Sequence, residues 1–104
     1  MFKNNREVAD ALEQKELLVK LCEEGAEVIQ SACKTIHYGP DGKWDNGLVN
    51  TEHLALEIGN LQAVINGLRA TGLVKDSVIA EGQRRMEEKL PNVLRHFKGL
   101  VNRG

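Results

Sequence analysis

Residues 18–36 read LVKLCEEGAEVIQSACKTI, and this stretch decides the fold. Its apolar and small residues recur at steps of three and four, which is the stripe of an amphipathic helix. The members of this stripe are Leu18, Cys22, Gly25, Ile29, Cys33 and Ile36. The pattern predicts a helix over 8–36, interrupted, if at all, near Gln14, that packs through this stripe.

A segment rich in turn residues follows over 37–50. Both Gly39-Pro40-Asp41-Gly42 and Asp45-Asn46-Gly47 are strong turn signals. The sequence therefore predicts a loop of about fourteen residues, which is long for a compact domain and of the length that is often functional or mobile.

Two further helical segments follow this loop. The second helix is expected to begin with Asn50 or Thr51 as its cap and to end before Gly72. Its apolar face consists of Leu54, Ile58, Leu61, Val64, Ile65 and Leu68. The third helix is expected to begin at Asp76 or Ser77 and to run to about residue 90. There Pro91 should end it, and a short fourth helix or turn is expected over 92–101.

The absence of strand-period alternation and of internal repeats predicts an all-α fold, a single helical domain over 1–104. Helices with one-sided apolar stripes pack as bundles. Two long helices and a shorter pair leave the core incomplete, so we expect a homodimer or homotetramer that completes the bundle. Gly25, Gly59, Gly67 and Gly82 fall inside the expected helices, either without consequence or because helices approach closely there.

Bulk composition restricts the class of protein. The net charge of −1 and the 28% of charged residues are ordinary for a soluble domain, with no basic surface that would indicate a nucleic-acid partner. The apolar runs are too short to span a membrane, and residues 1–6 lack the apolar core of a secretion signal. We therefore expect a cytoplasmic protein. Cys22 and Cys33 lie roughly 16 Å apart on one helix, too far for a disulfide, and are expected to serve as small apolar residues.

Acidic residues form the most informative pattern. Glu23, Glu24 and Glu27 can point to one side of the first helix, opposite its apolar stripe, which is either a solvated face or half of a metal site. Glu57 instead falls within the apolar sector of the second helix, with Asn60 one turn further on. A carboxylate there is costly unless it is paired, protonated or bound to metal. Oxygen-only ligands suit Mg²⁺ or Mn²⁺.

Two motifs resemble those of the MazG-type all-α nucleoside triphosphate pyrophosphohydrolases, in particular the compact phage and bacterial members. They are Lys20-Leu21-Cys22-Glu23-Glu24-Gly25-Ala26-Glu27 and Glu57-Ile58-Gly59-Asn60, and the resemblance covers about residues 17–97. It implies that Glu24, Glu27 and Glu57 bind Mg²⁺ (or Mn²⁺). Asn60 would complete the ligand set where the family usually carries Asp. Glu23, beside the ligands, is the candidate to orient or deprotonate the attacking water.

The substrate-binding residues are expected near the C-terminus. Lys89, Asn92 and Arg95 are similar to a family segment that contacts the phosphates of the substrate, although a solvated basic patch would look the same. Lys20 and Lys34 are either helpers or surface charges. In the loop, Trp44 is either a packing anchor or a surface on which a base stacks, and Tyr38 and His37 lie beside it.

The resemblance implies a hydrolase that converts a (deoxy)nucleoside triphosphate to the monophosphate and pyrophosphate. The alternative is a catalytically reduced homologue with the same helical fold that binds a nucleotide or a protein partner. The Asn at position 60 favours this alternative.

Overall fold

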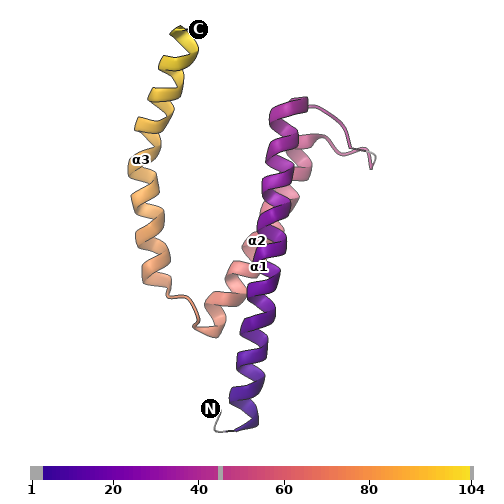
Figure 1. Ribbon diagram of the computed structural model, residues 1–104, viewed down its shortest axis with the longest axis vertical. Coiled ribbons are helices and arrows are strands. Elements are labelled where there is room, and N and C mark those ends of the chain that lie inside the picture. The colour runs from indigo at the N-terminus through magenta and orange to yellow at the C-terminus, as the bar shows by residue number, and fades with distance from the viewer. Residues whose placement is uncertain (1–3, 45, 104) are drawn as a thin grey trace. The chain divides into compact units, whose positions relative to one another are not determined.

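The computed structural model describes residues 4–44 and 46–103, without the side chains of Ala9 and of 100–103. Within these ranges the chain forms three α-helices and no strand: α1 (Asn5–Tyr38), α2 (Asn50–Thr71) and α3 (Asp76–Arg103) (Figure 1). The expected all-α fold is therefore confirmed. The helices belong to two compact units, Met1–Leu73 and Val74–Gly104, which are described separately below.

The first helix, α1, is continuous, and the possible interruption near Gln14 does not occur. The neighbouring residues 11–16 are good helix formers, so nothing in the chain breaks the helix there. The N-terminus is capped by Asn4, whose side-chain oxygen accepts a hydrogen bond of 2.9 Å from the backbone of Glu7. At the other end, Gly39 adopts a positive φ of 83° and donates its N–H to the carbonyl of Thr35.

The second helix, α2, ends before Gly72 as predicted, with this glycine in the left-handed conformation. Its start differs from the prediction, because Val49 is the N-cap residue instead of Asn50 or Thr51. Valine has no side-chain acceptor, and the carboxylate of Glu52 reaches back to accept from the Val49 N–H at 3.3 Å. Asn50 is buried and its side chain turns into the preceding loop.

The third helix, α3, runs through Pro91 without ending, so the separate fourth helix over 92–101 is wrong. Proline in a helix costs about 3 kcal/mol, because one backbone hydrogen bond is lost and its ring crowds the preceding turn. Strong helix formers precede it over 86–90, and Arg84 donates at 2.7 Å to both Glu81 and Glu88 one turn away. These ion pairs are exposed and each contributes only a few tenths of a kcal/mol.

The helices α1 and α2 pack side by side in antiparallel directions (Figure 1). The register follows from two contacts: Ser31 meets His53, and Leu17 meets Gly67. A Cβ added to Gly67 would lie 3.2 Å from the Cδ2 of Leu17, so this glycine marks a close helix approach. No such approach occurs at Gly25, Gly59 or Gly82, where an added Cβ would meet nothing within 4 Å among the described atoms.

The face of α1 that packs on α2 is not the predicted stripe. Leu17, Leu21, Glu24 and Val28 are half-buried and Ser31 is fully buried. Three large members of the predicted stripe are instead exposed: Leu18 (43%), Ile29 (66%) and Ile36 (79%). The free thiols of Cys22 and Cys33 are exposed on that same side. The sequence did not indicate that this face packs on α2, because two of its members, Glu24 and Ser31, are polar.

The core of the first unit is small. Among the described residues, Leu68 is the single apolar residue that is buried, with 2% of its surface exposed. No described helix is long and apolar enough to cross a membrane.

Candidate functional site

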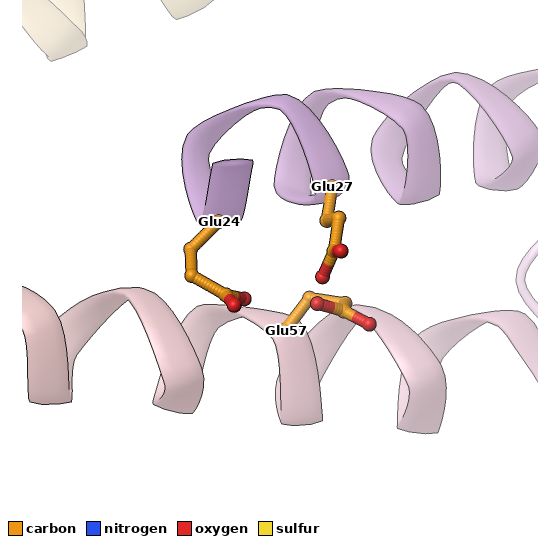
Figure 2. A group of neighbouring side chains, drawn as sticks. All are labelled: Glu24, Glu27 and Glu57. Carbon is orange, nitrogen blue, oxygen red and sulfur yellow. The ribbon is translucent and has the colours of Figure 1, made fainter. Parts of the chain in front are cut away.

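Three carboxylates meet between α1 and α2. Glu24 and Glu27 extend from α1, and Glu57 extends from the facing turn of α2 (Figure 2). One oxygen of each carboxylate lies within 4.8 Å of the others. The three residues that the resemblance implied as metal ligands are thus brought together by the antiparallel register of the two helices.

Burial distinguishes two members of this acidic cluster from ordinary surface acids. The side chains of Glu24 and Glu57 are only 13% and 14% exposed, whereas Glu27 lies at the solvent-facing edge. The Oε2 atoms of Glu24 and Glu57 are buried and have no hydrogen-bond partner among the described residues. An ionised oxygen in that position is costly unless something compensates it.

The three carboxylates of the acidic cluster repel one another. At an effective dielectric constant of about 20, two charges at this separation repel by roughly 3 to 4 kcal/mol. The ammonium of Lys20, whose Nζ lies 3.8 Å from Glu24, offsets part of this repulsion, and the imidazole Nε2 of His53 lies 3.7 Å from Glu57. Neither reaches the two buried oxygens. An all-oxygen set of this kind fits Mg²⁺ or Mn²⁺ better than zinc.

Glu23, the candidate for orienting water, lies apart from the three clustered oxygens. Its side chain is 54% exposed and forms an ion pair of 3.3 Å with Lys20. This hydrogen bond, together with the charges of Glu23 and Glu24, raises the pKa of Lys20 above its usual value. Asn60 lies one turn beyond Glu57 on α2 and is exposed.

The expected phosphate-binding residues lie on α3, in the second unit. Because α3 continues through Pro91, Lys89, Asn92 and Arg95 do have the helical spacing of three residues that the sequence suggested. All three are exposed, and the Arg95 Nε donates to the carbonyl of Pro91 at 3.4 Å.

His53 is a site residue that the sequence analysis missed. Its Nδ1 lies 3.2 Å from the hydroxyl of the buried Ser31, and its Nε2 faces Glu57. The indole of Trp44 stacks on its ring, with 3.7 Å between centroids and 12° between planes. His53 precedes Glu57 by four residues, the spacing at which side chains meet on a helix, and this was the available signal.

The loop that carries Trp44 is folded by local hydrogen bonds. The Asn50 side chain donates to the carbonyl of Gly39 at 2.8 Å, and the Asn50 backbone donates to Gly42 at 2.7 Å. A Cβ at Gly42 would lie 2.7 Å from the Asn50 amide nitrogen and 3.0 Å from the Tyr38 carbonyl oxygen, so a larger residue there would displace the Asn50 side chain. Trp44 closes the tip through backbone hydrogen bonds with Leu48 and Gly47. Through its stacking on His53, Trp44 packs against α2, which agrees with one of the two sequence interpretations; base stacking stays a prediction.

No protein-family model, no curated protein and no solved structure matches this chain. The likeness to the MazG-type enzymes thus remains a resemblance of motifs, and what the acidic cluster does is inferred from its own residues.

Proposed function

We propose that this chain is a nucleotide pyrophosphohydrolase dependent on Mg²⁺ or Mn²⁺, which hydrolyses a (deoxy)nucleoside triphosphate to the monophosphate and pyrophosphate. Acidic groups on protein surfaces often hold no ion. The observation that carries the proposal is therefore the burial of two unpartnered oxygens, one from Glu24 and one from Glu57, within a cluster of three carboxylates.

Each residue of the acidic cluster has a part in this proposal. Glu24, Glu27 and Glu57 would hold the metal, and the amide oxygen of Asn60 would be a further, neutral ligand. A bound divalent cation supplies charge stabilisation to a phosphoryl group and lowers the pKa of water. Glu23 would accept the proton of the attacking water. The water oxygen would form a bond to phosphorus as the bond to the departing pyrophosphate breaks.

His53 would act as a positioning residue for Glu57. Ligating carboxylates are commonly held by a second layer of polar partners, whose loss costs about 10- to 100-fold in metal affinity. The imidazole is itself fixed, by the Ser31 hydroxyl at one nitrogen and by Trp44 against its face. The orientation of Glu57 would in this way depend on both helices and on the loop.

Lys89, Asn92 and Arg95 are proposed to contact the phosphates of the substrate. Two cations and an amide on one helix can neutralise and orient triphosphate charge. The support for this role is their shared spacing on the continuous helix α3.

We also propose that the chain acts as a homodimer or homotetramer. A pair of helices with one fully buried apolar side chain among the described residues has little core of its own. The exposed Leu18, Ile29 and Ile36 form an apolar strip along α1 that another helix could cover.

A second candidate function is favoured by Asn60. A neutral amide in place of a carboxylate weakens a metal site, which is what a catalytically reduced nucleotide- or protein-binding homologue would have. Asn60→Asp separates the two. An impaired hydrolase should gain turnover, whereas a protein that works through another surface should be indifferent.

The test is pyrophosphate release from a panel of (deoxy)nucleoside triphosphates with Mg²⁺ or Mn²⁺. Glu57→Gln is assayed beside the wild type, with Glu16→Gln as the matched control, because Glu16 is exposed on α1 outside the acidic cluster. The proposal expects turnover that Glu57→Gln loses and Glu16→Gln keeps. Folded wild-type protein that turns over no nucleotide with either metal would overturn it.

A further inference from the structure

A pocket of about 340 Å³ lies where the loop meets the end of α1. It is lined by Lys34 and Tyr38 from α1 and by Lys43 and Trp44 from the loop. Small-molecule sites begin at about 300 Å³, so this volume suits a small ligand or one end of a larger one. The pocket is separate from the acidic cluster, with which it shares no residue.

The lining of this pocket consists of hydrogen-bond donors. Each lysine ammonium offers three N–H groups and no acceptor, and the indole of Trp44 offers one N–H. The phenol of Tyr38 can donate as well. The Trp44 Nε1 is buried and has no partner among the described residues. A ligand that satisfied the two ammonium groups and the phenol would have to supply several acceptor oxygens.

The charge of the pocket is positive and uncompensated by described acids. Neither Lys34 nor Lys43 forms an ion pair with any residue that the structure describes. Lys34 Nζ lies 3.6 Å from the centre of the Trp44 ring. This contact positions the ammonium but does not neutralise it, and it leaves N–H groups free to donate.

Two residues of the pocket lining, Trp44 and Lys43, are fixed by contacts with α2 and with the residues before it. Lys34 and His53 lie 3.6 and 3.7 Å from the same ring centre, so without overlapping each other they must occupy opposite faces of Trp44. The backbone of Lys43 is fixed by a bridge to Val49 at the base of α2. The Lys34 ammonium and the Trp44 ring are thus preorganised, which reduces the entropy lost when a ligand binds.

We propose that this pocket binds an oxyanion of the phosphate class. A phosphoryl group presents three strong acceptor oxygens, which matches the two lysine ammonium groups and the phenol of Tyr38. The group could belong to free pyrophosphate or phosphate, or to the phosphate chain of a nucleotide. The proposal rests on the residues of the pocket alone and does not require a metal at the acidic cluster.

Trp44 is the one tryptophan of the chain, so its fluorescence reports on this pocket directly. Pyrophosphate is titrated into the protein in the presence of a chelator, which removes divalent metals. The expected result is a saturable change in Trp44 emission. The matching heat of binding by calorimetry is measured in parallel, because changes at Lys34 alter the emission of the indole by themselves.

Two lysine variants and one control test the assignment. Lys34→Gln and Lys43→Gln should each weaken pyrophosphate binding at least about tenfold, the usual effect of losing a charge-assisted hydrogen bond. Lys15→Gln removes the same charge from an exposed position on α1 and should bind like the wild type. No saturable binding, or equal weakening in all three variants with helix content unchanged, would overturn the proposal.

Two further measurements are needed. One distinguishes a nucleotide from a free anion as the source of the phosphoryl group, and the other distinguishes the pocket proposal from the hydrolase proposal. A nucleoside triphosphate that binds more tightly than pyrophosphate identifies the nucleotide as the ligand, and the reverse identifies the free anion. Glu57→Gln should retain pyrophosphate binding in the chelator. Binding without turnover in the wild type would remove the hydrolase proposal alone, and turnover without this binding would remove the pocket alone.

Discussion

The indole of Trp44 lies face to face on the imidazole of His53, with ring centroids 3.7 Å apart. This contact joins the loop to α2 one helical turn before Glu57. Stacked aromatic pairs contribute about 0.5 to 1.5 kcal/mol beyond the area that they bury. The loop is therefore part of the support of the acidic cluster and not only a connection between two helices.

Replacement of His53 tests that support. His53→Gln should lower Mn²⁺ affinity about tenfold, because Glu57 loses the partner that orients it. The measurement is a calorimetric titration with Mn²⁺, accompanied by kcat and KM for any nucleotide that is turned over. His37→Gln, at the exposed end of α1, is the control. Equal Mn²⁺ affinity in both variants would show that His53 has no positioning role.

Replacement of Glu24 should have opposite effects with and without metal. In a chelator, Glu24→Gln should be at least as stable as the wild type, since one repelling charge is removed from the acidic cluster. With Mg²⁺ at 100 times its dissociation constant, the wild type should gain about 2.7 kcal/mol and the variant much less.

Urea unfolding with and without Mg²⁺ measures both effects. Glu16→Gln, on the same helix, should behave as the wild type under either condition. A wild type that Mg²⁺ stabilises no more than an equal ionic strength of NaCl would contradict the metal site.

Two glycines on α2 should respond differently to alanine. Gly59→Ala should stabilise the first unit by up to about 1 kcal/mol, because the added Cβ meets nothing and alanine favours helix. Gly67→Ala should gain less or lose stability, because its Cβ would press on Leu17 at 3.2 Å. Thermal unfolding of the two variants, monitored by circular dichroism, compares them directly. Equal gains would mean that the helices do not approach closely at Gly67.

The exposed strip of α1 should carry the contact between subunits. Ile29→Asp places a charge at a residue that is 66% exposed in the single chain, and it should shift the protein to smaller species. Sedimentation velocity across a range of protein concentrations measures the change. Gln30→Asp, next to the strip, should leave the assembly intact. A wild type that sediments as a monomer at every concentration would contradict the oligomer.

The helices could be predicted from the sequence because their signals are local. The apolar period located α2, and Gly72 marked its end. The prediction at Pro91 was wrong for the same reason. The rule that proline ends a helix considers only its immediate neighbours, whereas the helix-favouring residues and ion pairs over 81–90 precede it on α3. Val49 became the cap of α2 because Asn50 was engaged by the loop, a competition that the sequence does not display.

The acidic cluster was predictable in part. Glu57 stood out as a carboxylate in an apolar sector, and its side chain is indeed largely buried. The packed face of α1 was misassigned because it contains the polar Glu24 and Ser31, whereas the neighbouring stripe through Leu18 consists of apolar and small residues. The contacts of His53 with Ser31 and Trp44 depend on helix register and loop conformation, which are properties of the folded chain.

The closure of the loop by Asn50 also bears on the order in which the chain folds. Asn50 and Gly39 are 11 residues apart, and loops of about that length close in roughly 10 to 100 ns with a small loss of chain entropy. Glu24 and Glu57 are much farther apart along the chain and meet only after both helices have aligned. We therefore expect the turn around Trp44 to form first. The packing of α1 on α2 would then begin beside this turn and extend along the helices, and it would fix the register in which the three carboxylates meet.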